Sequence, residues 1–128
     1  MSKSWKSISK HEIQEIISTC LDKRKEVQFD YVFGSLTEGV FGPDSDIDLA
    51  VYLDEDSARN LDPLFETRLA LEIEKTICET YEVDILIINH ASLILQYQVT
   101  NKGELVHSKD ESKARDFEAL VRKKYFDF

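Results

Sequence analysis

Apolar residues recur at helical spacing in several stretches of the chain. Residues 10–24 carry them at every third or fourth position, and Ser9 followed by Glu12 has the spacing of a capping box. A helix with one buried face is expected there. The same spacing predicts a short helix over residues 92–100 and a final helix marked by apolar positions within residues 117–124.

Four other stretches have the apolar pattern of strands. They cover residues 27–33, 46–53, 82–88 and 104–107, the last as a short edge strand. Residues 82–88 are rich enough in β-branched side chains that we expect this strand to be buried on both faces. Helices and strands alternate along the chain, which predicts an α/β fold with a small mixed β-sheet flanked by helices.

The segments between the strands carry turn and helix-start signals. Residues 36–41 predict a short helix or turn, and residues 54–60 are polar and predict a loop. Asp62 followed by Pro63 predicts a helix start, an N-cap with proline at the first helical position. The apolar positions after it predict that this helix runs to about Thr80.

Length and composition predict one domain over residues 1–128. Apolar residues make up 42% and charged residues 32%, as in ordinary globular proteins. No stretch is apolar enough to span a membrane, and the N-terminus lacks the apolar core of a secretory signal. Cys20 and Cys78 fall on apolar helix faces, where we expect free thiols and hence a reducing, cytoplasmic location.

The charge balance narrows the classes of partner. Lys and Arg number 16 against 25 Asp and Glu, a net charge of −9. Binding to nucleic acid usually relies on a basic face, so direct nucleic-acid binding is not expected. The acidic balance suits cation binding or docking on a basic protein partner, although many acidic surfaces serve only solubility.

Two aspartates at the start of the second predicted strand are the first candidate for chemistry. Side chains alternate along a strand, so Asp46 and Asp48 point the same way, with Cα atoms roughly 6.5 Å apart. Ile47 and Leu49 then face the core. At that separation two carboxylates repel by about 2.5 kcal/mol at an effective dielectric of 20. A divalent cation would turn this repulsion into chelation, whereas solvated aspartates at a strand edge are the simpler alternative.

Asp84 interrupts a run of apolar residues in the third predicted strand. A charge in such a strand must be paired, protonated or bound to metal, and an arginine partner is an alternative to metal. If this strand lies beside the second in register, Asp84 joins Asp46 and Asp48. Three carboxylates of this kind can hold two Mg²⁺ ions, as in polymerase-type phosphoryl transfer.

Gly34 and Ser35 end the first predicted strand and complete the pattern. Glycine lets the backbone approach a phosphate closely, a helix starting after it would direct N–H groups at an anion, and the serine hydroxyl adds a donor. Taken alone, the pair is also typical of an ordinary strand-ending turn. Combined with the three aspartates, it predicts a site for a nucleoside triphosphate and metal.

These motifs carry a family resemblance. Residues 33–35, Gly39 and residues 45–51 together resemble the minimal nucleotidyltransferase (MNT) branch of the DNA polymerase β-type nucleotidyltransferase superfamily. Val83-Asp84 and residues 102–106 fit the same resemblance. Within that branch the chain is most similar to MntA-type antitoxins, which are encoded beside a HEPN-domain ribonuclease toxin, HepT.

The resemblance implies an antitoxin that transfers AMP from ATP to a tyrosine hydroxyl of the toxin. It implies that Asp46 and Asp48 bind Mg²⁺, that Asp84 is a third carboxylate and candidate general base, and that Gly34 and Ser35 hold the triphosphate. It also implies a hetero-oligomer with the HEPN toxin as partner.

One position departs from the family pattern, and two other functions remain open. Many relatives have a basic residue just before the second glycine, whereas Glu38 precedes Gly39 here. The triphosphate charge must then be offset by metal or by a lysine or arginine from elsewhere. The alternatives are an antitoxin that neutralises the toxin by binding alone, and a nucleotidyltransferase acting on a small molecule or an RNA end.

Overall fold

The described part of the chain builds one four-stranded sheet. The computed structural model describes residues 8–37, 46–77 and 81–127. The strands run in the order β3-β2-β1-β4; β2 and β3 are parallel and the other neighbours antiparallel, so the sheet is mixed. Their bounds are β1 Val27–Phe33, β2 Ile47–Leu53, β3 Val83–Ile87 and β4 Glu104–Ser108.

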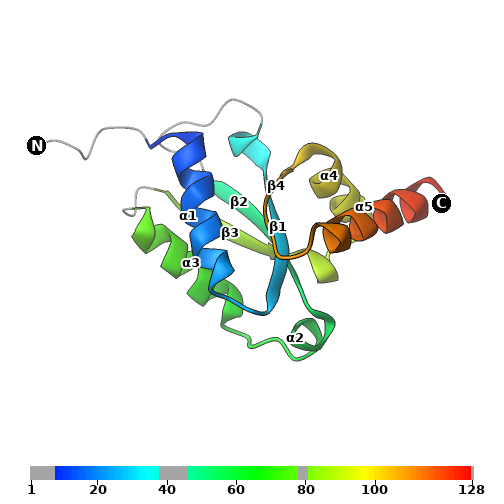
Figure 1. The fold of residues 1–128 in the computed structure, drawn as a ribbon, viewed down its shortest axis with the longest axis horizontal. Coiled ribbons are helices and arrows are strands. Elements are labelled where there is room, and N and C mark those ends of the chain that lie inside the picture. The colour runs from blue at the N-terminus through cyan, green and yellow to red at the C-terminus, as the bar shows by residue number, and fades with distance from the viewer. Residues whose placement is uncertain (1–7, 38–45, 78–80, 128) are drawn as a thin grey trace, which may run out of the picture.

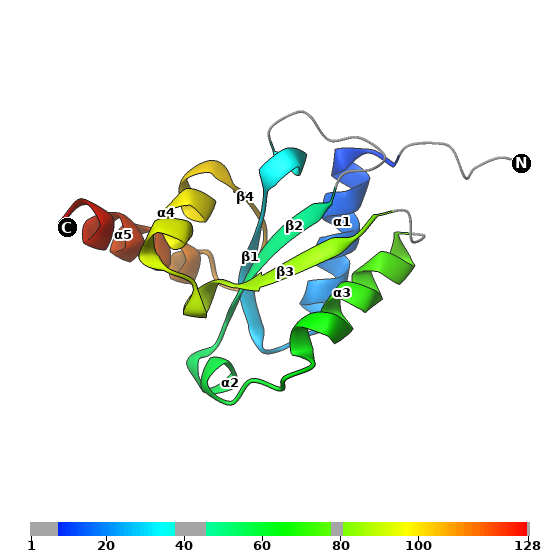
Figure 2. The ribbon, with the colours of Figure 1, turned by 180° about the vertical axis from the view of Figure 1, so that it is seen from behind.

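Helices cover both faces of this sheet (Figure 1). α1 and α3 lie on one face, and α4 and α5 lie on the other, as the view from behind also shows (Figure 2). The described helices are α1 Lys10–Asp22, α2 Glu55–Arg59, α3 Phe65–Thr76, α4 Leu93–Lys102 and α5 Glu111–Phe126. The predicted α/β fold, a small mixed sheet flanked by helices, is confirmed.

The face under α1 and α3 is an aliphatic core. Ile47, Leu49 and Val51 of β2 are fully buried against Ile17 of α1 and Ile73 of α3. Removing a side chain of this size from water is worth about 1.5–3 kcal/mol. Because side chains alternate along β2, the residues between these positions face α4 and α5.

The face under α4 and α5 is more aromatic. The ring of Phe29 stacks on Tyr52 at 4.6 Å between centroids and meets Phe117 of α5 at 5.7 Å. The hydroxyl of buried Tyr31 donates a hydrogen bond of 2.6 Å to Glu118 of α5. These contacts fix α5 on β1 and leave the opposite end of the same face to polar residues.

Several sequence predictions hold. Ser9 and Glu12 form the capping box of α1, with hydrogen bonds of 2.9 and 3.1 Å. The predicted edge strand near residue 104 is β4. Cys20 is a buried free thiol, and Cys78 lies outside the described residues.

The connection between β2 and α3 was predicted wrongly. The expected loop at residues 54–60 contains α2, because Asp54 caps it by accepting hydrogen bonds from the backbone N–H and the hydroxyl of Ser57. Asp62 is not the N-cap of the next helix. It forms a turn in which its side chain accepts from the N–H of Leu64, and α3 begins at Phe65.

The burial expected for the third strand is also wrong. β3 is an edge strand with one neighbour, β2, and its central residues are exposed or half-buried. Its β-branched residues pack on the α3 side while the other side is more open. The helix expected to reach Thr80 ends at Thr76, and residues 78–80 lie outside the described part.

Candidate functional site

The parallel pairing of β2 and β3 brings two of the predicted carboxylates together. Asp48 and Asp84 are direct partners in this register, with Ile47 opposite Val83 and Leu49 opposite Ile85. Paired residues of parallel strands project to the same face of a sheet. Ile47 and Leu49 belong to the aliphatic core, so Asp48 and Asp84 project to the face covered by α4 and α5.

Asp46, the third predicted carboxylate, lies two residues before Asp48 and just ahead of β2. Burial raises the pKa of the Asp48 carboxyl, and the negative charges of Asp84 and Asp46 raise it further. Like charges have this effect only when they lie close together. Asp46, Asp48 and Asp84 thus lie at the same end of β2 and β3, and we call these three residues the carboxylate cluster.

Gly34 borders the carboxylate cluster and has no room for a side chain. It opens the short 3₁₀ helix η2, Gly34–Leu36, directly after β1, and its φ of +72° is a left-handed conformation that favours glycine. A Cβ at this position would collide with the carboxyl oxygen Oδ2 of Asp48. The requirement for glycine is thus set by both the backbone turn and the neighbouring carboxylate.

A threonine that sequence reasoning missed holds this turn. The backbone N–H and the hydroxyl of Thr37 both donate to the carbonyl oxygen of Gly34, at 3.1 and 3.0 Å. The signal was present in the sequence as a glycine followed three residues later by a threonine, a spacing that suits a side-chain-closed turn. Ser35 lies in η2 and its role in holding a triphosphate stays a prediction, while Glu38 and Gly39 lie outside the described residues.

The environment predicted for Asp84 is wrong. We expected a charge inside a buried strand, but the Asp84 side chain is exposed at the sheet edge. It needs no arginine partner to offset burial, and none of the described basic residues forms an ion pair with it. The pairing with Asp48, rather than desolvation of Asp84 itself, singles out this position.

The donor set fits a hard divalent cation. Carboxylate oxygens are the ligands that Mg²⁺ prefers, and the side chains of Asp46 and Asp84 are exposed to solvent. Among the described residues no three His, Cys, Asp or Glu side chains are already close enough to enclose a metal ion. Mutual repulsion of three anions disfavours that approach, and a divalent cation would favour it.

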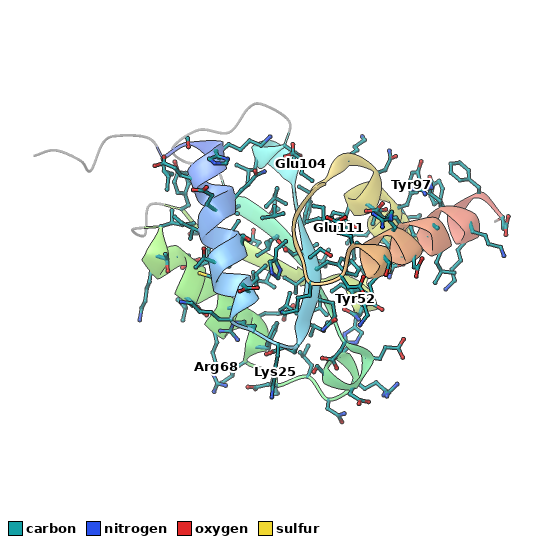
Figure 3. The ribbon with its side chains drawn as sticks, in the orientation of Figure 1. Lys25, Tyr52, Arg68, Tyr97, Glu104 and Glu111 are labelled. Carbon is teal, nitrogen blue, oxygen red and sulfur yellow. The ribbon has the colours of Figure 1, made fainter. Side chains whose placement is uncertain are left out.

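Two cavities lie away from the carboxylate cluster. They measure about 570 and 370 Å³ and share Asp54, which follows the C-terminal end of β2. Lys25 lines the larger cavity, and Tyr52 lines the smaller one. Figure 3 shows both residues far from Glu104, which lies at the end of the molecule near η2. The cluster lies at the N-terminal ends of β2 and β3, and we take it as the candidate site because Asp48 and Asp84 are directly paired residues of adjacent strands.

No helix within residues 8–37, 46–77 and 81–127 is long and apolar enough to cross a membrane.

Three solved structures of similar fold are described as toxin–antitoxin structures. A toxin–antitoxin structure with AMP-PNP is 26% identical, with a TM-score of 0.72, covering 88% of this chain and 86% of that chain. A MntA–HepT toxin–antitoxin structure is 23% identical, with a TM-score of 0.69, covering 90% and 86%. A chain in the structure of a tri-AMPylated HEPN toxin of Shewanella oneidensis in complex with MNT antitoxin is 22% identical, with a TM-score of 0.70, covering 91% of this chain and 86% of that chain.

Comparison by sequence gives the family. No curated protein matches the chain significantly. The family model described as polymerase beta, nucleotidyltransferase matches residues 14–112, a span that includes Gly34, the whole carboxylate cluster and all four strands. The chain therefore belongs to the polymerase beta nucleotidyltransferase family.

Proposed function

We propose that this protein is a cytoplasmic antitoxin that transfers AMP from ATP to a tyrosine hydroxyl of a HEPN-domain ribonuclease toxin and so silences it. One observation carries the proposal: Asp48 and Asp84 pair across β2 and β3 beside Gly34, with Asp46 close enough to act on Asp48. The AMP-PNP and the tri-AMPylated toxin in structures of similar fold support the choice of donor and acceptor.

The reaction is an exchange of one phosphorus–oxygen bond for another. The tyrosine oxygen forms a bond to the α-phosphorus of ATP, and the bond from that phosphorus to the bridging oxygen of pyrophosphate breaks. The hydroxyl proton passes to a base, and pyrophosphate leaves with the electron pair of the broken bond. Positioning and charge stabilisation are the main tasks of the protein in such a transfer.

We assign the tasks to the residues of the cluster and the adjoining turn. Asp46, Asp48 and Asp84 would hold Mg²⁺, which when bound lowers the pKa of the attacking hydroxyl and stabilises the charge of the triphosphate and pyrophosphate. Asp84 is exposed and can accept the hydroxyl proton. Gly34 and Ser35 would bind the triphosphate, because glycine at φ +72° admits it close to the backbone.

The proposal is tested by weighing the partner. The purified chain is mixed with its partner toxin, ATP and Mg²⁺, and the toxin is measured by intact-protein mass spectrometry. We expect mass increases in units of AMP, located on tyrosine by peptide fragmentation, and none with Asp48→Asn. A toxin of unchanged mass would remove a protein acceptor from consideration.

A second candidate is neutralisation by binding alone. It is favoured by one observation, that the described carboxylates are aligned without forming a closed group of three ligands. This alternative predicts that the double variant Asp46→Asn, Asp48→Asn still co-purifies with the toxin and still protects cells. We expect co-purification without protection.

A further inference from the structure

Within the described part of the chain, no basic side chain is paired with the carboxylate cluster. None of the described lysines and arginines forms an ion pair with Asp46, Asp48 or Asp84. Proteins commonly hold phosphate groups with Lys or Arg in addition to metal ions. A cation that belongs to this site must therefore come from an element at the margin of the cluster.

The covering helix α4 supplies a candidate on the side that faces the sheet. Leu95 and Val99 of this helix pack into the aromatic core, where Val99 is 1% exposed. Lys102 follows Val99 by three positions, so it continues the same side of the helix beyond the core. Lys102 is exposed, is the one basic residue of α4, and forms no ion pair with any described residue.

Close packing brings the end of α4 to the strand that leads into Gly34. A Cβ at Gly103 would lie 3.0 Å from the carbonyl oxygen of Val32 and 3.5 Å from the Cβ of Phe33. Phe33 pairs with Asp48 and directly precedes Gly34. Figures 1 and 2 both show this end of α4 near η2, at the same end of the sheet. Lys102 therefore borders the site from the α4 side.

Other lysines near this end of the sheet are less suited. Lys10 of α1 forms an ion pair of 2.8 Å with Glu104. Lys75 lies in the last turn of α3, and both α1 and α3 lie on the opposite face of the sheet. Of Lys10, Lys75 and Lys102, only Lys102 lies on the same face of the sheet as the carboxylate cluster and forms no ion pair with a described carboxylate.

We propose that Lys102 binds the triphosphate of the donor nucleotide and supplies the positive charge that the carboxylate cluster lacks. The proposal rests on the proposed nucleotidyl transfer, because it assigns Lys102 to the donor of that reaction. It predicts that replacing Lys102 weakens the binding of the donor nucleotide and has little effect on folding.

Binding of phosphate compounds to the chain tests this role without the transfer reaction. The probes are ATP, inorganic tripolyphosphate and AMP, each titrated by calorimetry in the presence of Mg²⁺. We expect Lys102→Gln to weaken the binding of ATP and tripolyphosphate by about tenfold, the worth of one charge-assisted hydrogen bond, and to leave AMP binding nearly unchanged. Lys102→Arg should restore most of the affinity for tripolyphosphate.

Lys75→Gln is the matched control, because Lys75 is likewise an exposed lysine in the last turn of a helix. It removes the same charge from a helix C-terminus, and we expect wild-type binding of all three probes. Thermal unfolding of each variant shows whether the fold is kept. In AMP transfer, Lys102→Gln should raise the KM for ATP with little change in kcat.

The outcomes separate this inference from the proposed function. If the wild type adds AMP to the toxin and Lys102→Gln binds tripolyphosphate as the wild type does, Lys102 is not a triphosphate ligand and the transfer stands. If Lys102→Gln loses tripolyphosphate affinity while the wild type adds no AMP to the toxin, the lysine assignment stands and the protein acceptor is wrong. Equal losses in Lys102→Gln and Lys75→Gln would also overturn the inference.

Discussion

Asp30 and Asp48 lie on adjacent strands, yet their surroundings differ in the features that separate a structural carboxyl from a functional one. Asp30 is 0% exposed and projects to the α1 side of β1, and burial raises its pKa well above the ordinary value. Burial also raises the pKa of Asp48, which is half-buried on the other face. Burial is thus the leading cause at both sites.

The effect of neighbouring charges on the pKa differs between the two aspartates. Asp48 is acted on by two further acids, Asp84 and Asp46, which raise its pKa again. Asp30 faces basic groups: the Nδ1 of His107 lies 4.0 Å from its carboxyl, and the charge of Lys109 lowers its pKa. Neither carboxyl oxygen of Asp30 meets hydrogen-bond geometry with any described residue, although the backbone of His107 approaches it. Burial favours the protonated form of Asp30 against the opposing charge of Lys109, whereas gathered acids open to solvent attract a cation.

The largest effect is expected at the cluster. Asp48→Asn keeps the size of the side chain and removes its charge, so AMP transfer to the toxin should fall by at least ~100-fold, because losing even an outer-shell group of a metal site costs 10–100-fold. Asp56→Asn, an exposed aspartate on α2, is the control and should retain full activity. Transfer within twofold of wild type in Asp48→Asn would remove the cluster from the mechanism.

The glycine that borders the cluster should show the next largest effect. Gly34→Ala places a side chain at φ +72° and against Asp48, so we expect a loss of about 1–2 kcal/mol in unfolding free energy. Chemical denaturation measures this loss. AMP transfer, compared at equal amounts of folded protein, should fall further, because Asp48 is displaced. Unchanged transfer would show that Asp48 tolerates movement.

Asp30 should make the free energy of unfolding fall as pH rises, because its pKa is raised in the native state. The native state holds the Asp30 proton above pH 3.8, the ordinary pKa, where the unfolded state loses it. Its contribution to stability is therefore complete below that pH and declines as pH rises toward the native pKa, by at most about 1.4 kcal/mol per pH unit.

Asp30→Asn removes this pH-dependent contribution. Above about pH 4 the free energy of unfolding of the variant should therefore fall less steeply than that of the wild type. Urea denaturation from pH 4 to 8 measures both proteins, and all other ionisable groups, including those that face Asp30, are common to the two. Parallel pH profiles would mean that Asp30 titrates as an ordinary carboxyl.

The smallest effect is expected at the ion pair between α1 and β4. Lys10 and Glu104 lie 2.8 Å apart, with side chains 44% and 43% exposed. Exposed pairs of this kind contribute about 0.2–1 kcal/mol, so Lys10→Ala should lower unfolding free energy by less than about 1 kcal/mol and leave ATP binding unchanged. A tenfold loss of ATP affinity would instead place Lys10, rather than Lys102, at the triphosphate.

Most of the fold could be predicted because local patterns fixed its elements. The capping box of Ser9 and Glu12 and the alternation in residues 27–33 and 46–53 led to elements that the structure contains. The failures came where two local signals competed. Asp62 before Pro63 looked like a helix start, but the Asp62 carboxyl accepts from Leu64 N–H and from Arg68, which stabilises a turn instead.

The carboxylate cluster shows what sequence can and cannot supply. Alternation along one strand predicted that Asp46 and Asp48 share a face, and the structure places Asp48 in β2 and Asp46 just ahead of it. The partnership of Asp48 with Asp84 depended on the strand order and register, which a sequence read alone leaves open. The edge position of β3, and with it the exposure of Asp84, was likewise a property of the assembled sheet, as was the packing of α4 that brings Lys102 to the site.

The central claim, that Asp46, Asp48 and Asp84 together bind a divalent cation for a nucleoside triphosphate, is tested most directly by titration with Mn²⁺ monitored by electron paramagnetic resonance. Mn²⁺ is spectroscopically visible and accepts the same oxygen ligands as Mg²⁺. We predict that AMP-PNP strengthens Mn²⁺ binding by the wild-type chain, and that Asp48→Asn and Asp84→Asn each abolish this gain while Asp30→Asn retains it. Equal Mn²⁺ binding by the wild type and the triple variant Asp46→Asn, Asp48→Asn, Asp84→Asn would contradict the claim.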